Sequence, residues 1–119
     1  MYDDNNIFAR ILRGEIPCKK VYEDDHTLAF EDINPEAPVH TLVIPKGKYT
    51  SLKDFAAKAS DGEIGALVRA VNKVAELKGV KDSGFRILSN AGADAHQTVE
   101  HLHIHVFGGR VLGPMLVKK

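Results

Sequence analysis

Four of the six histidines of this chain lie within ten residues of one another, between His96 and His105. Three of them, His101, His103 and His105, alternate with apolar residues in the run HLHIHVF. Because side chains on a strand alternate between its two faces, this run predicts one apolar face and one face of three imidazoles. Neighbouring imidazoles in that row would lie roughly 6.6 Å apart along the strand. The row therefore suits an elongated, phosphate-sized ligand better than a point-like one.

Three interpretations of the histidine row remain open from the residues alone. The row is a solvated strand face, it contributes to a metal site, or it carries nucleophilic catalysis. For a metal, His40 supplies a further ligand from a distant segment, and strand-borne histidines do build zinc sites. For catalysis, neutral imidazole is a good nucleophile near pH 7 and can form a covalent phosphoryl intermediate. Neighbouring imidazoles then supply donors to the phosphate oxygens without a metal.

The composition of the 119-residue chain narrows the class of protein. Hydrophobic residues make up 44% and charged residues 27%, which is typical of one folded domain. The 16 basic and 16 acidic residues give a net charge of zero, which argues against a nucleic-acid-binding protein. Cys18 is the single cysteine, so a reducing, cytoplasmic setting is expected. No apolar run reaches the roughly 20 residues that span a membrane, and the acidic first residues do not resemble a secretory signal.

The elements that must position the histidines follow from hydrophobic periodicity and from turn and cap signals. Ser60 and Glu63 form a capping-box pattern, which begins a long helix that ends near Gly79. The apolar face of this helix is expected to comprise Ile64, Leu67, Val68, Val71, Val74 and Ala75. One short helix is expected over 6–13, and five strands over 19–23, 26–32, 40–45, 84–90 and 101–107. This order of elements predicts an α+β fold with a mostly antiparallel five-stranded sheet.

The run HLHIHVF resembles the signature of the histidine triad (HIT) superfamily, in which three histidines alternate with apolar residues. The resemblance extends through His40 and the segments NNIF, EIP, EDD, LAF, LVIPK and GGR, and these are similar to the histidine triad nucleotide-binding (HINT) branch. It implies a single HIT domain over residues 1–119, with a core over about 6–110 and a C-terminal tail over 111–119. It also implies a homodimer in which the sheets of the two protomers are joined.

The HINT branch implies a purine nucleoside phosphoramidase. Such an enzyme cleaves the P–N bond of a nucleoside 5′-phosphoramidate, such as an AMP-lysine conjugate, and releases AMP or GMP and an amine. The resemblance makes His103 the nucleophile of a nucleotidyl-histidine intermediate, with no metal or other cofactor. It also implies supporting roles for His101, His105 and His40 and places the Thr98 hydroxyl near the leaving amine. The alternatives are a dinucleoside polyphosphate hydrolase and a nucleotide-binding regulatory protein with incidental catalysis, acting on a protein partner.

The residues expected to bind the nucleotide come from strand ends and from the segment before the triad. They are Asp32, Ile33, Asn90, His96, Gln97, Thr98, His103 and His105, with Asp32 accepting hydrogen bonds from the ribose hydroxyls. The base slot is expected to consist of apolar side chains that would otherwise count as core residues, namely Ile7, Phe8, Ile11, Phe30 and Leu42. Three positions depart from the family pattern: Thr98 replaces a frequent Ser, Glu100 a frequent aromatic residue, and His96 a frequent Gly.

Overall fold

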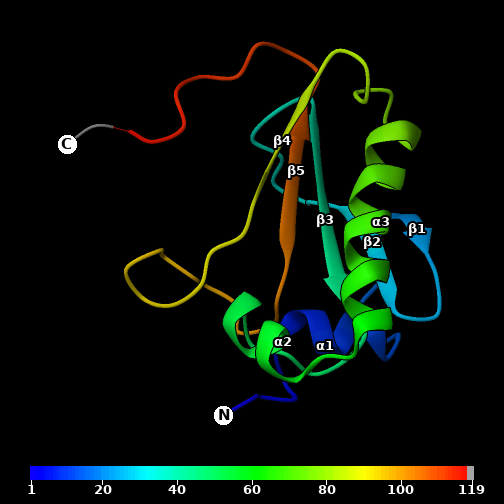
Figure 1. Cartoon of the computed structure of the whole chain (residues 1–119), viewed down its shortest axis with the longest axis vertical. Coiled ribbons are helices and arrows are strands. Elements are labelled where there is room, and N and C mark those ends of the chain that lie inside the picture. The colour runs from blue at the N-terminus through cyan, green and yellow to red at the C-terminus, as the bar shows by residue number, and fades with distance from the viewer. Residues whose placement is uncertain (118–119) are drawn as a thin grey trace.

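Five antiparallel strands form a single sheet, in the order β1-β2-β3-β5-β4, in a computed structural model that describes residues 1–117 (Figure 1). The strands are β1 (Lys20–Glu23), β2 (Thr27–Glu31), β3 (Val39–Pro45), β4 (Phe85–Leu88) and β5 (Ile104–Gly108). The helices are α1 (Ile7–Leu12), α2 (Leu52–Lys58) and α3 (Asp61–Leu77). The predicted α+β fold with a five-stranded antiparallel sheet is therefore confirmed.

The long helix α3 begins at the predicted capping box. The Ser60 hydroxyl accepts from the Glu63 backbone N–H at 3.1 Å, and the Glu63 carboxylate accepts from the Ser60 backbone N–H at 3.0 Å. The predicted apolar face was wrong at Val68, which is 65% exposed, while Ala70 is buried instead. The helix covers one face of the sheet through a core cluster that includes side chains of α3, β3 and β5 (Figure 1).

The central strand β3 carries core residues on both of its faces. All seven of its residues are buried, and its side chains alternate between two clusters. Val43 packs in the cluster beneath α3, whereas Leu42 and Ile44 pack in a second cluster with Phe8 of α1. The Asn6 side chain caps α1 by accepting from the Ala9 backbone N–H at 2.9 Å. The sheet is therefore covered by α3 on one side and by α1 on the other.

Two parts of the structure differ from the elements expected from sequence. Helix α2 was not predicted, because it has seven residues and buries Phe55 alone, which leaves a weak periodic signal. Strand β5 begins at Ile104 rather than at His101. The preceding residues leave the ladder because the Leu102 N–H donates to the Tyr49 carbonyl, at 2.8 Å, in the loop before α2. Leu102 and Val106 still belong to the core beneath α3, as the alternation predicts.

None of the helices within residues 1–117 has the length and hydrophobicity needed to cross a membrane.

Candidate active site

The His103 ring lies at the start of β5, on the face of the sheet that α1 covers. Its Nδ1 lies 2.7 Å from the backbone carbonyl oxygen of His101. Because a carbonyl oxygen only accepts, Nδ1 carries the ring proton and Nε2 keeps its lone pair. The edge of the Phe8 ring packs against the imidazole, with the ring centroids 4.8 Å apart. Burial lowers the pKa of His103 below its ordinary value of 6.5, so the ring is neutral at pH 7.

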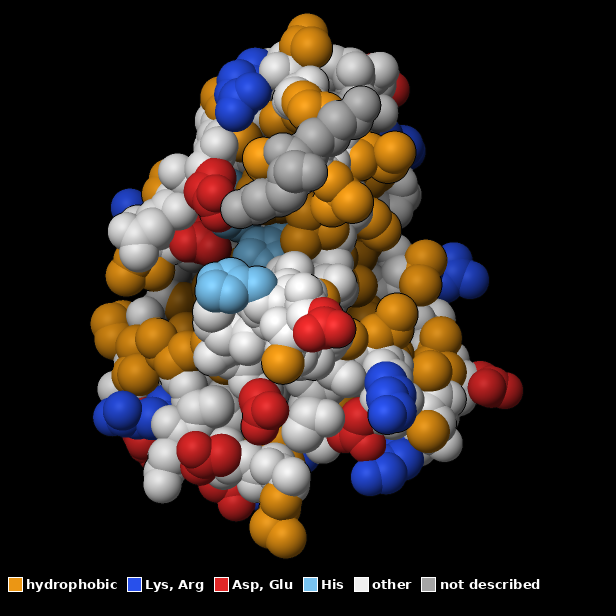
Figure 2. Space-filling model, turned by 90° about the vertical axis from the view of Figure 1, so that its left-hand side faces the viewer, with side chains coloured by type: hydrophobic (Ala, Val, Ile, Leu, Met, Phe, Trp, Pro, Cys, Tyr) orange, Lys and Arg blue, Asp and Glu red, His pale blue; other side chains and the backbone are white. Residues whose placement is uncertain are grey.

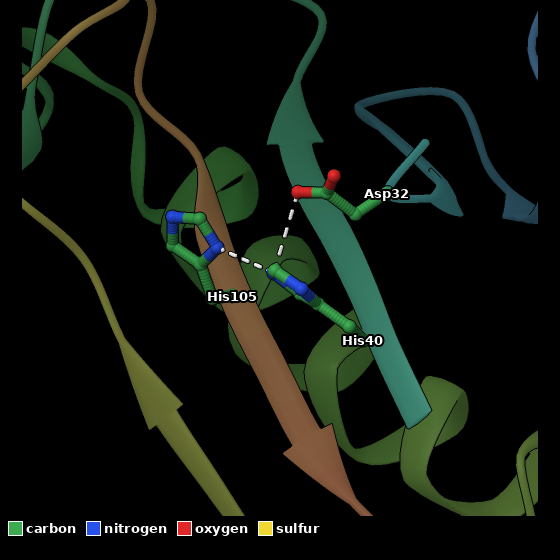
Figure 3. Close-up of side chains that lie close together, drawn as sticks. All are labelled: Asp32, His40 and His105. Atoms are coloured by element: carbon green, nitrogen blue, oxygen red, sulfur yellow. Dashed lines mark hydrogen bonds and ion pairs between the residues drawn. The ribbon is translucent and has the colours of Figure 1, made fainter. Parts of the chain in front are cut away.

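A chain of hydrogen bonds fixes the tautomer of His105, and Figure 3 shows its last link, from His40 to His105. The Glu36 backbone N–H donates to His40 Nδ1 at 3.1 Å, so the proton of His40 lies on Nε2. That Nε2 lies 2.8 Å from His105 Nδ1, which therefore accepts. Burial, followed by the nearby His103 and His40 rings, lowers the pKa of His105 to about 4. Neutral His105 then carries its proton on Nε2, where it is a hydrogen-bond donor.

The rings of His103 and His105 are neighbours that offer opposite chemistry. Their centroids are 5.1 Å apart. Among the described residues, Thr27 Oγ1 is the single buried side-chain atom without a hydrogen-bond partner, so the two Nε2 atoms reach solvent. A lone pair on His103 and an N–H on His105 thus belong to neighbouring rings, and both atoms keep some contact with solvent. Figure 2 shows histidine side chains near the middle of one face of the molecule, one group set back in a hollow and another standing out beside it.

The Asp32 carboxylate lies beside this pair, just beyond the end of β2. One oxygen is 3.3 Å from His40 Nε2, and the other accepts from the Asn34 backbone N–H at 2.8 Å (Figure 3). The second contact, from the Asp32 side chain to the backbone two residues later, is typical of an Asp that begins a turn. Asp32 therefore both closes the turn and points a carboxylate oxygen toward the histidines.

The environment of His101 differs from that of the other two triad histidines. Its side chain is fully buried, and both ring nitrogens have partners within the protein. Nε2 donates to the Pro45 carbonyl at 2.8 Å, and Nδ1 accepts from the Tyr2 hydroxyl at 2.5 Å. Burial lowers the pKa of His101 to about 4. His101 thus meets His103 through its backbone carbonyl, and its ring has no nitrogen left for a ligand.

The loop before the triad is held by its own side chains. The Gln97 amide donates to the Thr50 carbonyl at 2.6 Å, and the Asn90 amide donates to the Ala95 carbonyl at 2.7 Å. Both predicted nucleotide contacts therefore have internal partners in this structure. Thr98 is exposed, and His96 is exposed in a left-handed backbone conformation with φ of 61°. A glycine adopts that conformation without strain, which agrees with His96 standing at a position where Gly is frequent.

The predicted base-slot residues divide into buried and accessible ones. Phe8, Phe30 and Leu42 belong to the core cluster on the α1 side of the sheet, so they can shape a slot from beneath. Ile7 and Ile33 are exposed, and Ile33 has 83% of its surface free. Ile11 is half-buried against the same cluster. Accessible apolar surface for a base therefore lies at Ile7, Ile11 and Ile33.

Asp32, His40 and His105 also fit the description of a metal site. Each offers one ligand atom, and these atoms lie within 4.8 Å of one another. In this structure the same atoms are joined by direct contacts, which satisfy them without an ion. The three residues can therefore either form a hydrogen-bond chain or bind a metal ion. Binding a metal would break the hydrogen bonds of the chain.

Sequence reasoning missed the groups that fix the histidine tautomers. They are the Tyr2 hydroxyl, the Glu36 backbone N–H and the carbonyl of Pro45. Two of the three are backbone groups, and the residue types in the sequence do not indicate where backbone groups lie in the fold. Tyr2 is 99 residues from its partner, so no local spacing pairs the two.

Comparison with known proteins gives consistent matches along the chain. The model of the HIT domain matches residues 13–112. A 13.2 kDa HIT-like protein of Azospirillum brasilense is 64% identical, over 98% of this chain and 96% of that protein. The purine nucleoside phosphoramidase of Escherichia coli K12 is 40% identical, over 98% of this chain and 97% of that protein.

Solved structures agree with these matches. A HIT family hydrolase from Clostridium thermocellum superposes with a TM-score of 0.87 at 40% identity, covering 97% of this chain and 99% of that chain. A histidine triad protein from Clostridium difficile superposes with a TM-score of 0.84 at 44% identity, covering 98% of this chain and all of that chain.

Proposed function

The chain belongs to the HIT domain family of hydrolases, and from this premise we propose that it is a purine nucleoside phosphoramidase. It would hydrolyse the P–N bond of a purine nucleoside 5′-phosphoramidate to the nucleoside monophosphate and an amine. The proposal rests above all on the neighbouring rings of His103 and His105, of which the first carries a lone pair and the second an N–H at Nε2. An attack on phosphorus needs both a nucleophile and a donor for the charge that develops on the oxygens.

In the proposed first step, His103 Nε2 attacks the phosphorus and the P–N bond to the amine breaks. The amine keeps the electron pair of that bond and takes a proton that we propose is relayed through the solvent-exposed Thr98 hydroxyl, which recovers a proton from water in the same step. The His105 Nε2–H donates to a non-bridging oxygen as negative charge builds there. His103 keeps its Nδ1 proton throughout, so the nucleotidyl-imidazole is cationic, and the His101 carbonyl stabilises that charge.

In the second step, water attacks the phosphorus, loses a proton to solvent, and displaces His103. The leaving group is a neutral imidazole that still carries its Nδ1 proton, so it departs without further proton transfer. The nucleoside monophosphate is released and the starting tautomer of His103 is restored. Two modest displacements thus replace one difficult one.

The nucleotide would be held by the surfaces around the two rings. We propose that the Asp32 carboxylate accepts from the ribose hydroxyls and that the base lies on Ile7, Ile11 and Ile33. These three side chains are apolar, which suits a planar base and leaves the choice between adenine and guanine open. We further propose a cytoplasmic setting, on the ground of the single cysteine.

We also propose that the enzyme is a homodimer that joins its sheets through β4. This strand is at one edge of the sheet, and it exposes the apolar side chains of Phe85, Ile87 and Leu88. Exposing the apolar side chains of an edge strand to solvent is unfavourable. Pairing with the same strand of a second copy would bury them and satisfy the free backbone groups.

The proposal is tested by steady-state hydrolysis of a nucleoside phosphoramidate by the full chain and two variants. We expect His103→Ala to lower kcat by several orders of magnitude while AMP still binds, because it removes the covalent route and few ground-state contacts. The matched control is His26→Ala, which removes an exposed histidine of the β1–β2 turn and should leave kcat unchanged. Retained turnover in His103→Ala would contradict the proposal. Cleavage of dinucleoside polyphosphates in preference to phosphoramidates would favour the alternative hydrolase.

A further inference from the structure

The N-terminal segment lies against the buried side of the triad. Its Tyr2 hydroxyl bonds to His101 Nδ1, and the two rings meet edge to face with centroids 5.5 Å apart. This contact joins the first residues of the chain to a residue 99 positions away. Because His101 Nε2 donates to the Pro45 carbonyl, the Nδ1 atom holds the ring's lone pair and the Tyr2 hydroxyl donates to it.

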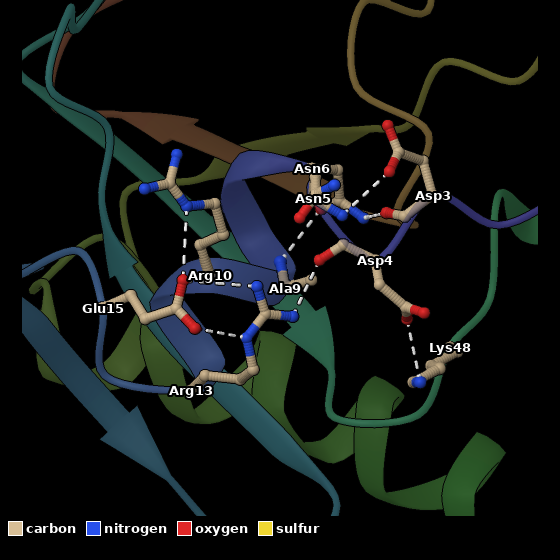
Figure 4. Close-up of polar contacts among 9 residues, drawn as sticks. All are labelled: Asp3, Asp4, Asn5, Asn6, Ala9, Arg10, Arg13, Glu15 and Lys48. Atoms are coloured by element: carbon tan, nitrogen blue, oxygen red, sulfur yellow. Dashed lines mark hydrogen bonds and ion pairs between the residues drawn. The ribbon is translucent and has the colours of Figure 1, made fainter.

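Several contacts hold the segment in place (Figure 4). The Asp4 carboxylate pairs with Lys48 at 2.8 Å, and the Asp4 carbonyl accepts from the Arg13 guanidinium at 2.7 Å. The Asp3 carboxylate accepts from the Asn5 backbone N–H at 2.8 Å. Arg13 follows the last residue of α1 and Lys48 lies in the loop after β3, so two of these contacts tie the segment to the folded domain.

We propose that Tyr2 is a positioning residue for the catalytic histidine, acting through the ring and backbone of His101. The His101 carbonyl accepts the His103 Nδ1 proton at 2.7 Å, and this bond keeps the lone pair on His103 Nε2. The same peptide group is held at its other end, where the Leu102 N–H donates to Tyr49. The His101 ring, anchored between Tyr2 and Pro45, is the second support of that carbonyl.

The tautomer of His103 is what Tyr2 protects. A neutral imidazole without a fixed partner populates both tautomers, and the form with the proton on Nε2 has no lone pair to attack phosphorus. Burial keeps His101 neutral at pH 7, so its Nδ1 remains an acceptor for the Tyr2 hydroxyl. Without that hydroxyl the buried Nδ1 has no donor, and the ring gains freedom to move with its carbonyl.

The test compares Tyr2→Phe, which removes only the hydroxyl, with the wild-type chain. As activity readout it uses the proposed phosphoramidase reaction, on which the inference rests. We expect kcat to fall about tenfold with KM unchanged, which corresponds to one hydrogen bond of ordinary strength. Nitrogen-15 NMR of the imidazoles should show His103 shifting from the Nδ1–H toward the Nε2–H tautomer. The matched control is Tyr22→Phe, which removes a hydroxyl bonded to Asp24 at 2.9 Å and should change neither readout.

The outcomes separate this inference from the proposed function. An unchanged kcat together with an unchanged His103 tautomer in Tyr2→Phe would overturn the inference. A raised KM at constant kcat would also overturn it, because Tyr2 would then bind substrate directly. If the wild-type chain does not hydrolyse phosphoramidates, the proposed function fails, while the NMR comparison still decides the role of Tyr2.

Discussion

The buried His101 ring predicts a loss of stability in acid that a single substitution should remove. The pKa of His101 is about 4 in the folded protein, against an ordinary value of 6.5, and the cause is burial. Below pH 6.5 the unfolded chain binds a proton at this residue that the folded protein does not. The free energy of unfolding therefore falls as the pH drops from 6.5 toward 4. Above pH 6.5 His101 is neutral in both states and causes no such loss.

The size of the effect follows from the two pKa values. Each pH unit within the window removes about 1.4 kcal/mol of unfolding free energy. Between pH 7 and pH 4.5 the loss of unfolding free energy from His101 amounts to about 2 kcal/mol. His101 is 0% exposed, so solvent screening does not reduce this figure appreciably.

The assay is urea unfolding of the wild type and of His101→Gln at pH 7 and pH 4.5, at one protein concentration. The Gln amide can still donate to the Pro45 carbonyl, but it does not titrate. The wild type should lose about 2 kcal/mol more than the variant between the two pH values, because the other acidic and basic groups cancel in the comparison. Equal losses in the two proteins would refute the assignment of His101 as a buried neutral ring.

Three further predictions concern catalysis and assembly. His40→Ala should lower kcat about tenfold, because His105 loses the group that fixes its tautomer, and an unchanged kcat would contradict the hydrogen-bond chain. The wild-type pH–rate profile should fall in acid with a midpoint below 6.5, because burial lowers the pKa of His103 and protonation removes its lone pair; a midpoint above 6.5 would argue against this nucleophile. Ile87→Lys on the edge strand should convert a dimer into a monomer in light scattering, whereas Val68→Lys, at a similarly exposed residue of α3, should leave the dimer intact.

The elements with strong local signals could be predicted from sequence. The capping box at Ser60 gave the start of α3, and the alternation in HLHIHVF gave the inward face of β5. Helix α2 could not be predicted, because it is short and buries Phe55 alone. The exposure of Val68 could not be predicted either, since the width of the apolar stripe depends on how α3 lies across the sheet.

The candidate site was predictable in its residue types and not in its connections. Alternation places three imidazoles on one face, yet it does not say what covers that face. Phe8 and Tyr2 come from the N-terminal region and cover His101, which converts one third of the expected ligand row into an internal support. The tautomers of His103 and His105 depend on carbonyl and N–H groups of the backbone, whose positions follow only from the folded chain.

The proposed mechanism requires that His103 Nε2 attacks phosphorus and becomes covalently nucleotidylated. The most direct test is rapid quenching of the wild-type chain during a single turnover of a nucleoside phosphoramidate, followed by mass spectrometry of its peptides. We expect one nucleoside monophosphate adduct on the peptide that holds the triad, localised to His103 and absent from His103→Ala. Product formed without any such adduct, or an adduct localised to another histidine, would contradict it.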